Sequence, residues 1–251
     1  MKKLCFLFFL IVANQTSYAQ HSIKDSTILL SMIHFDAAIQ MPAGDLKERF
    51  GNSTCIGVGF HIKNKSNLVY GIEGGYLFGN DVKNKSSIYE GIRGADGSVI
   101  SQEGKIANIL IYERGYQVHA DFGKIIAFKK PNPNSGILIR AGVGFMEHKI
   151  RIESRQDKIQ QLEDEYLKGY DKLTNGLLLH QLIGYQYYSN SRFANFFAGF
   201  EFSEAFTKSR RSFDFDLMQK DNTKRTDILM GLKFGWVIPI YKSKPSDFYL
   251  Y

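Results

Sequence analysis

After its first 20 residues the chain contains no apolar run of the ~18 residues that a transmembrane helix needs. It has two cysteines, and only Cys55 lies outside the N-terminal apolar run, so the mature chain cannot form an intrachain disulfide. The surplus of 32 basic over 25 acidic side chains is small, and no basic run is interleaved with aromatic residues. We therefore predict no nucleic-acid partner. No nucleophile elbow, phosphate-binding glycine loop or paired-cysteine site is found, so no catalytic residue, metal or cofactor is predicted.

The first 20 residues have the pattern of a secretory signal peptide. Lys2 and Lys3 supply the positive start, and an apolar run follows over residues 4–12. Ser17 and Ala19 place small residues at the −3 and −1 positions of a cut after Ala19, and a cut after Gln20 fits nearly as well. We predict a signal peptide at residues 1–20, a membrane domain at 21–241 and a tail at 242–251.

Eight later segments alternate apolar and polar residues with a period of two, which is typical of β-strands with two different faces. In the last of them Leu232, Phe234 and Trp236 share one face, and Lys233 and Gly235 share the other. The expected strands are residues 32–41, 54–62, 68–79, 110–123, 136–152, 177–187, 193–206 and 227–238. Strands of about 9–11 residues are long enough to cross a membrane at a tilt.

The connections between these segments alternate in length. Those after the second, fourth and sixth segments are short and rich in turn residues, whereas those after the first, third, fifth and seventh are long. Short periplasmic turns and long extracellular loops are the rule for outer-membrane barrels. With an even number of strands, both chain termini are expected in the periplasm.

Glycines on the polar faces distinguish a membrane barrel from a soluble sandwich. In a soluble sheet the polar face meets water, and glycine there weakens the strand without a gain. In a narrow lumen, glycines such as Gly57, Gly142 and Gly235 leave room for long charged side chains. The sequence therefore predicts an all-β fold, an eight-stranded antiparallel up-and-down transmembrane β-barrel. We expect it to be monomeric, in contact with lipid, in the outer membrane of a Gram-negative bacterium.

On this strand pattern and its aromatic last strand, the chain resembles the small outer-membrane barrels of the OmpA/OmpX type. It also resembles the broader outer-membrane β-barrel family that includes the PorT-like accessory proteins of protein secretion. The resemblance implies a non-enzymatic scaffold or accessory subunit of a secretion or assembly machine.

The interior of an eight-stranded barrel is only just wide enough for its own side chains, so no open pore is expected. The inward positions carry more acidic than basic residues, and such charges are costly unless they are paired. Asp36, Glu73, Arg140 and Lys233 lie near the middle of their strands. We predict a salt-bridge network among these four side chains.

A second cluster of inward residues is expected near the extracellular rim. His148 and His180 lie on adjacent strands, with Glu201 and Asp227 on the following two at comparable height. Imidazoles near carboxylates are able to bind a transition metal or act as an acid–base pair. These four residues are the candidate site of the alternative function, a lipid-modifying outer-membrane enzyme.

The loops and the tail are the expected surfaces for a protein partner. In the loop at residues 153–175, Ile159, Leu162, Tyr166 and Tyr170 follow a spacing that favours a short amphipathic helix, which either caps the barrel mouth or docks a partner. The tail ends in a cluster of aromatic side chains, and exposing such a cluster to water without a contact is unfavourable. Phe248, Tyr249 and Tyr251 either fold back on the barrel base or engage a periplasmic partner.

Overall fold

The computed structural model describes residues 23–24, 26–88, 90–128, 130–154, 158–190 and 194–241. The predicted signal peptide, and the tail with Phe248, Tyr249 and Tyr251, lie outside the described residues. Among those described, no helix has the length and apolarity to cross a membrane.

Eight antiparallel strands form a closed barrel, and each strand pairs with its neighbours in the sequence. The strands are β1 (Leu30–Gly44), β2 (Ser53–Lys63), β3 (Leu68–Gly79), β4 (Ile109–Ala127), β5 (Gly136–Ser154), β6 (Thr174–Tyr187), β7 (Phe196–Ser209) and β8 (Lys224–Tyr241). The barrel closes where β1 pairs with β8, from Leu30 opposite Tyr241 to Gly44 opposite Asp227. The predicted all-β, eight-stranded up-and-down barrel is confirmed, and this is the fold of the small outer-membrane barrels.

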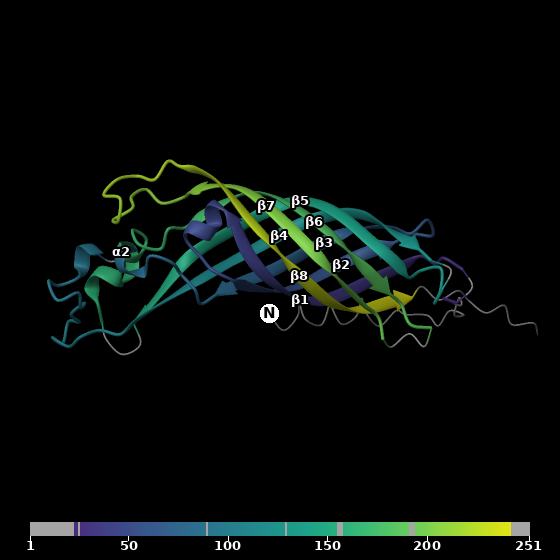
Figure 1. Ribbon diagram of the computed structural model, residues 1–251, viewed down its shortest axis with the longest axis horizontal. Coiled ribbons are helices and arrows are strands. Elements are labelled where there is room, and N and C mark those ends of the chain that lie inside the picture. The colour runs from purple at the N-terminus through teal and green to yellow at the C-terminus, as the bar shows by residue number, and fades with distance from the viewer. Residues whose placement is uncertain are drawn as a thin grey trace, which may run out of the picture.

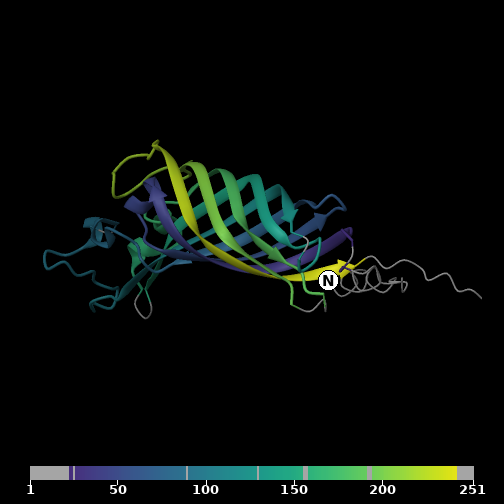
Figure 2. The same cartoon turned by 45° about the vertical axis from the view of Figure 1, so that its right-hand side comes forward.

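Figure 1 shows the strands running at a tilt along the barrel, with the long connections gathered at one end. We call this the loop end. The opposite end, called the terminal end, carries the short turns, the beginning of β1 and the end of β8. Figure 2 shows β8 in yellow lying beside β1 in purple, where the cylinder closes.

The two faces of the wall differ as the alternation predicted. Large apolar side chains are exposed around the outside, among them Phe35, Ile72, Phe122 and Trp236. A soluble monomer rarely exposes a continuous apolar surface of this kind, because water does not favour it. The inward side chains between them are buried. The outer wall therefore has the surface of a protein that meets hydrocarbon.

Two apolar clusters fill the barrel near its ends, which the prediction of a polar lumen did not include. The loop-end cluster joins inward residues such as Met146, Leu178 and Leu229 to loop residues such as Leu46 and Phe50. The terminal-end cluster packs inward side chains against Ile23 and Ile28, which precede β1. It consists of Ile23, Ile28, Leu30, Met32, Val69, Ile125, Leu138, Leu182, Tyr188, Phe197 and Val237.

Residues that precede β1 are hydrogen-bonded to side chains at the terminal end of the barrel. The Asn134 side-chain amide donates to the carbonyls of Ile23 and Ser26 at 3.1 and 2.9 Å, and its oxygen accepts from the Ile28 amide at 3.0 Å. The buried Lys63 ammonium donates to the Ile28 carbonyl at 3.0 Å. These bonds satisfy polar groups that burial would otherwise leave costly.

The loops at the loop end include short helices. They are η1 (Asp45–Glu48), α2 (Lys85–Ile88), η2 (Glu90–Ile92), η3 (Gln160–Leu162) and α3 (Asp164–Leu167). The single amphipathic helix expected in residues 153–175 is therefore replaced by two single turns. Ile159, Leu162 and Tyr170 are buried in the loop-end cluster, whereas Tyr166 is exposed. Of the two alternatives for this loop, the structure shows the one in which it caps the barrel mouth.

Leu232→Arg tests which medium the outer wall meets. Leu232 lies in the middle of β8 and is 71% exposed. We expect arginine there to destabilise the barrel in lipid vesicles by about 2–4 kcal/mol, because it places a charge in hydrocarbon. Ile106, also 71% exposed, lies in a loop, and Ile106→Arg is expected to change stability by about 0.5 kcal/mol or less. Denaturant unfolding in vesicles measures both, and equal small effects would contradict a membrane-facing wall.

Candidate functional site

A layer of ionisable side chains crosses the middle of the barrel, with at least one member from every strand. All of its members are buried. We call it the ionic layer, and it consists of His34, Asp36, His61, Glu73, His119, Asp121, Arg140, His180, Glu201 and Lys233. Because alternate residues of each strand point inward, a single register of the closed barrel brings these ten side chains to one place.

Lys233 is the principal cation of the ionic layer. Its Nζ lies 3.2 Å from Asp36 Oδ1 and 3.2 Å from Glu201 Oε2, and it also donates a hydrogen bond to Glu73 Oε1. Arg140 Nη1 lies 3.2 Å from the other oxygen of Glu73. The structure thus brings together the four side chains of the predicted salt-bridge network, with Glu73 contacting both cations.

Four histidines connect the carboxylates that the two cations do not neutralise alone. His34 Nε2 lies 3.3 Å from Asp36 and 3.1 Å from Glu73. His180 contacts Asp121 at 3.4 Å and Glu201 at 3.5 Å. His61 and His119 contact Asp121 at 3.3 and 3.0 Å. The two rings of each pair stack, His34 on His61 and His119 on His180. Each carboxylate of the layer therefore contacts a cation or an imidazole.

Glycines on the neighbouring strands make space for these side chains. Gly57 lies directly opposite Asp36, and a Cβ added to Gly57 would approach Asp36 Oδ1 to 2.6 Å. Gly142 has the same relation to Asp121. Gly57 and Gly142 thus have the role that the sequence predicted for them, whereas a Cβ at Gly235 would meet the Phe197 ring.

Three groups within the ionic layer have ligand atoms close enough together for a metal ion. One is His119, Asp121 and His180, whose nitrogen and oxygen atoms lie within 4.8 Å of one another. The rings of His119 and His180 are stacked 4.1 Å apart at an interplanar angle of 22°, so they lie face to face. Asp121 also contacts Arg140 at 3.5 Å. This arrangement is that of an ion-pair network that stabilises the barrel interior.

The rim site proposed from the sequence is wrong as a single site. His180 lies opposite Gly142, whereas His148 lies six residues further along β5, opposite Thr174. At about 3.3 Å per residue the two histidines are about 20 Å apart along the strand. The structure therefore divides the four residues into two pairs: His180 with Glu201 in the ionic layer, and His148 with Asp227 nearer the loop end.

The pair nearer the loop end is buried and does not have the geometry of an activated nucleophile. His148 Nε2 lies 2.9 Å from Asp227 Oδ2, and the Thr207 hydroxyl donates to the same oxygen at 2.5 Å. A nucleophilic hydroxyl would need to donate to the imidazole. Arg49, which follows η1, donates to Asp227 Oδ1 at 2.7 Å. Arg49 lies in a loop without periodicity, so the sequence carried no signal for this contact.

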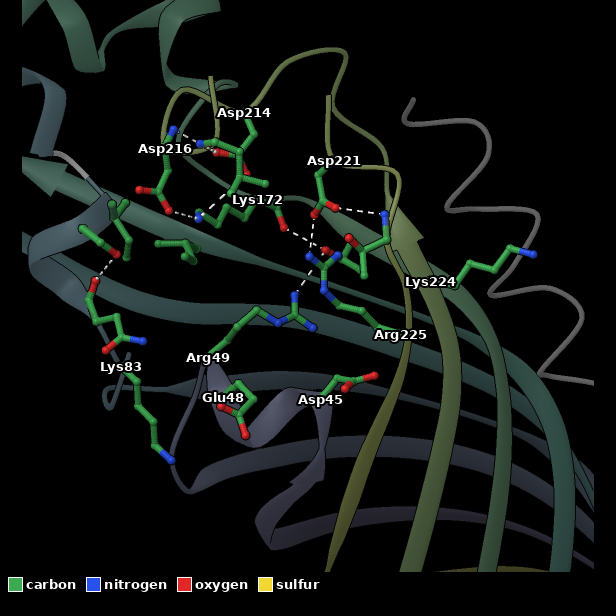
Figure 3. A pocket seen from close by; sticks show the side chains of 17 residues that line it. Asp45, Glu48, Arg49, Lys83, Lys172, Asp214, Asp216, Asp221, Lys224 and Arg225 are labelled. Atoms are coloured by element: carbon green, nitrogen blue, oxygen red, sulfur yellow. Dashed lines mark hydrogen bonds and ion pairs between the residues drawn. The ribbon is translucent and has the colours of Figure 1, made fainter. Parts of the chain in front are cut away.

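An accessible polar pocket of about 330 Å³ lies at the loop end, and Arg49 is part of its lining. We call it the mouth pocket. Figure 3 shows its charged residues converging from η1 and Arg49, from Lys83, from Lys172 and from residues 214–225. Its lining contains five acidic and five basic side chains. Several are already paired: Lys172 with Asp216 at 2.6 Å and Arg225 with Asp221 at 2.5 Å. Burial opposes ionisation of Asp221, but hydrogen bonds from Thr223 and Arg225 outweigh it and lower its pKa.

Comparisons with known proteins find similarity to solved structures of small barrels. Solved structures with similarity include Ail, the attachment invasion locus protein of Yersinia pestis (11% identity, 84% of this chain and 99% of that chain, TM-score 0.42). Neisserial surface protein A (12%, 82% and 96%, 0.37) and the N-terminal β-barrel domain of Pseudomonas aeruginosa OprF (11%, 82% and 96%, 0.38) are similar in the same way. The sequence matches no protein-family model and no curated protein.

Lys233→Met tests the ionic layer. It leaves three buried carboxylates without their shared cation, so we expect a loss of about 3–5 kcal/mol in the free energy of unfolding. Adding Glu73→Gln should recover part of that loss, because it removes one of the unpaired charges. Lys149→Met, at an exposed position of β5, is the control and should be close to neutral. Urea unfolding measures all variants, and additive losses in the double variant would contradict direct coupling.

Proposed function

We propose that this protein is a barrel of the Gram-negative outer membrane, with the loop end outside the cell and both termini in the periplasm. The apolar outer wall supports a membrane setting, since its side chains stay exposed in an isolated chain. The short turns at the terminal end and the long loops at the other support the orientation. The signal peptide predicted at residues 1–20 agrees with export.

We propose further that the barrel conducts no solutes and has no catalytic role. The observation that carries this is the filling of the lumen: a buried ionic layer lies between two apolar clusters. A solute would have to pass all three layers. The charged side chains of the ionic layer form ion pairs with one another. Such an interior fits a rigid support better than a catalytic centre.

The surface that remains for recognition is the loop end. There the mouth pocket offers charges of both signs on loops that the loop-end cluster holds against the barrel. Such a surface suits a polar segment of a protein partner, since complementary charges give specificity. We therefore propose a scaffold or accessory subunit that binds a protein partner through its extracellular loops. A place in a secretion or assembly machine is what the PorT-like resemblance implies. The tail with Phe248, Tyr249 and Tyr251 is a second proposed partner surface.

Conductance and crosslinking test this function. Purified protein in a planar lipid bilayer should give no conductance steps, because its lumen is filled. A photo-crosslinking residue at Glu48 in the mouth pocket should capture one defined protein in the native outer membrane, whereas the same residue at Lys124, on the outer wall near the terminal end, should not. Open-channel steps, or the same products from both positions, would contradict the proposal.

The enzyme alternative has a separate test. The buried position of His148 and His180 gives lipid no access to either imidazole. We expect that deleting the gene leaves the mass profile of the outer-membrane lipids unchanged. A lipid species that appears or disappears, and is restored by the wild-type protein but not by His148→Ala, would establish the enzyme instead.

A further inference from the structure

A second hollow lies at the loop end on the outer side of the wall, where β6 and β8 begin and β7 ends. Its volume is about 360 Å³, and its lining contains four basic side chains and no acidic one. The mouth pocket has equal numbers of both signs, and a hollow of about 370 Å³ beside β2 and β3 contains Asp81 and no basic residue. Of these three hollows, only this one is lined by basic residues without an acidic one. We call this hollow the β6–β8 groove, and its principal residues are Asn175, Leu177, Phe206, Lys208, Arg210 and Lys224.

Two lysines of the groove face each other across the strand pair. Lys208 of β7 lies directly opposite Lys224 of β8, and both are exposed. Like charges at directly opposed positions destabilise a sheet. Within the described part of the chain, neither lysine has a carboxylate partner among the ion pairs. In Figure 3 the Lys224 side chain points away from the other labelled residues of the mouth pocket.

The other two basic residues differ in how far they are neutralised. Arg225 is already paired with Asp221 at 2.5 Å. Arg210 donates from Nε to the neutral side-chain oxygen of Asn175, so its charge has no counter-ion there. Among the described residues, Lys208, Lys224 and Arg210 thus have no ion-pair partner, and the carboxylate of Glu147 accepts a hydrogen bond from the Asn175 amide at 2.8 Å. This surplus favours a ligand with concentrated negative charge.

The floor of the groove is apolar. Leu177 and Phe206 are 52% and 47% exposed and point outward. On β7 the charge of Lys208 follows Phe206 by two residues, or about 7 Å along the strand. The groove thus lies where the apolar wall meets the polar loop end. A free anion would use only the basic residues, whereas a lipid with an anionic headgroup would use both the charges and the floor.

We propose that the β6–β8 groove binds the phosphate headgroup of an anionic membrane lipid, with its acyl chains along Leu177 and Phe206. This inference rests on the membrane setting in the proposed function. Phosphate oxygens accept strong charge-assisted hydrogen bonds from ammonium and guanidinium groups. A bound phosphate between Lys208 and Lys224 would also relieve their repulsion.

The test compares lipids on the refolded barrel in a neutral detergent, with bound lipid counted by native mass spectrometry. The probes are phosphatidic acid, phosphatidylcholine and inorganic phosphate. We expect the wild type to bind phosphatidic acid in preference to phosphatidylcholine. Lys208→Gln with Lys224→Gln should weaken phosphatidic acid binding about 25-fold, since each direct hydrogen bond that is lost contributes about fivefold. The control, Lys124→Gln with Lys149→Gln, removes the same charge from exposed positions outside the groove and should change binding less than about twofold.

Three results would overturn the inference: equal weakening in the control variant, no preference for phosphatidic acid, or competition by inorganic phosphate as strong as by the lipid. The first would mean that net charge alone attracts the lipid, and the last would mean an ion site without a lipid. The barrel's resistance to heat in detergent shows that each variant is folded. A barrel that inserts into vesicles but shows no lipid preference contradicts only this inference, whereas one that fails to insert contradicts the proposed function.

Discussion

The pairing of buried charges inside a closed, narrow cylinder is the constraint on which this structure depends. Since alternate residues of a strand face opposite sides, an apolar outer face leaves the polar residues facing inward. The interior of an eight-stranded barrel has room for little besides these side chains. Four carboxylates, two permanent cations and four imidazoles must then satisfy one another. The contacts of Lys233 with three carboxylates, and of Glu73 with both cations, show how few arrangements meet this condition.

Because side chains fill the lumen, the pockets with room for a ligand lie at the surface. The ionic layer and the two apolar clusters occupy the lumen, so the features that remain accessible lie at the loop end. The mouth pocket, with charges of both signs, and the β6–β8 groove, with one sign above an apolar floor, are different in character. The protein partner proposed above would bind at the first, and the proposed anionic lipid at the second. A rigid core supports both surfaces without taking part in either.

Sequence reasoning predicted the wall better than the interior. Alternation identifies a strand's two faces, because a shift of one residue would reverse every side chain, and so Asp36 and Lys233 were assigned inward correctly. The alternation did not give the relative positions of His148 and His180 along the barrel axis. These depend on the register between β5 and β6, which neither strand's own sequence indicates. The alternation also gave no sign of the loop-end cluster, because inward apolar residues such as Leu229 are covered by loop residues that follow no period.

The ionic layer is completed only when β1 pairs with β8 and closes the barrel. Lys233 lies on the last strand, and its partners Asp36 and Glu73 lie on the first and third. Hairpins with short turns bring together residues close in the chain, whereas this seam joins its two ends and carries the largest loop-closure entropy. Asp36 and Glu73 therefore contact Lys233 only when the ring is complete, although Glu73 also contacts Arg140 of β5. The same strand pairing closes the cylinder and completes the ionic layer.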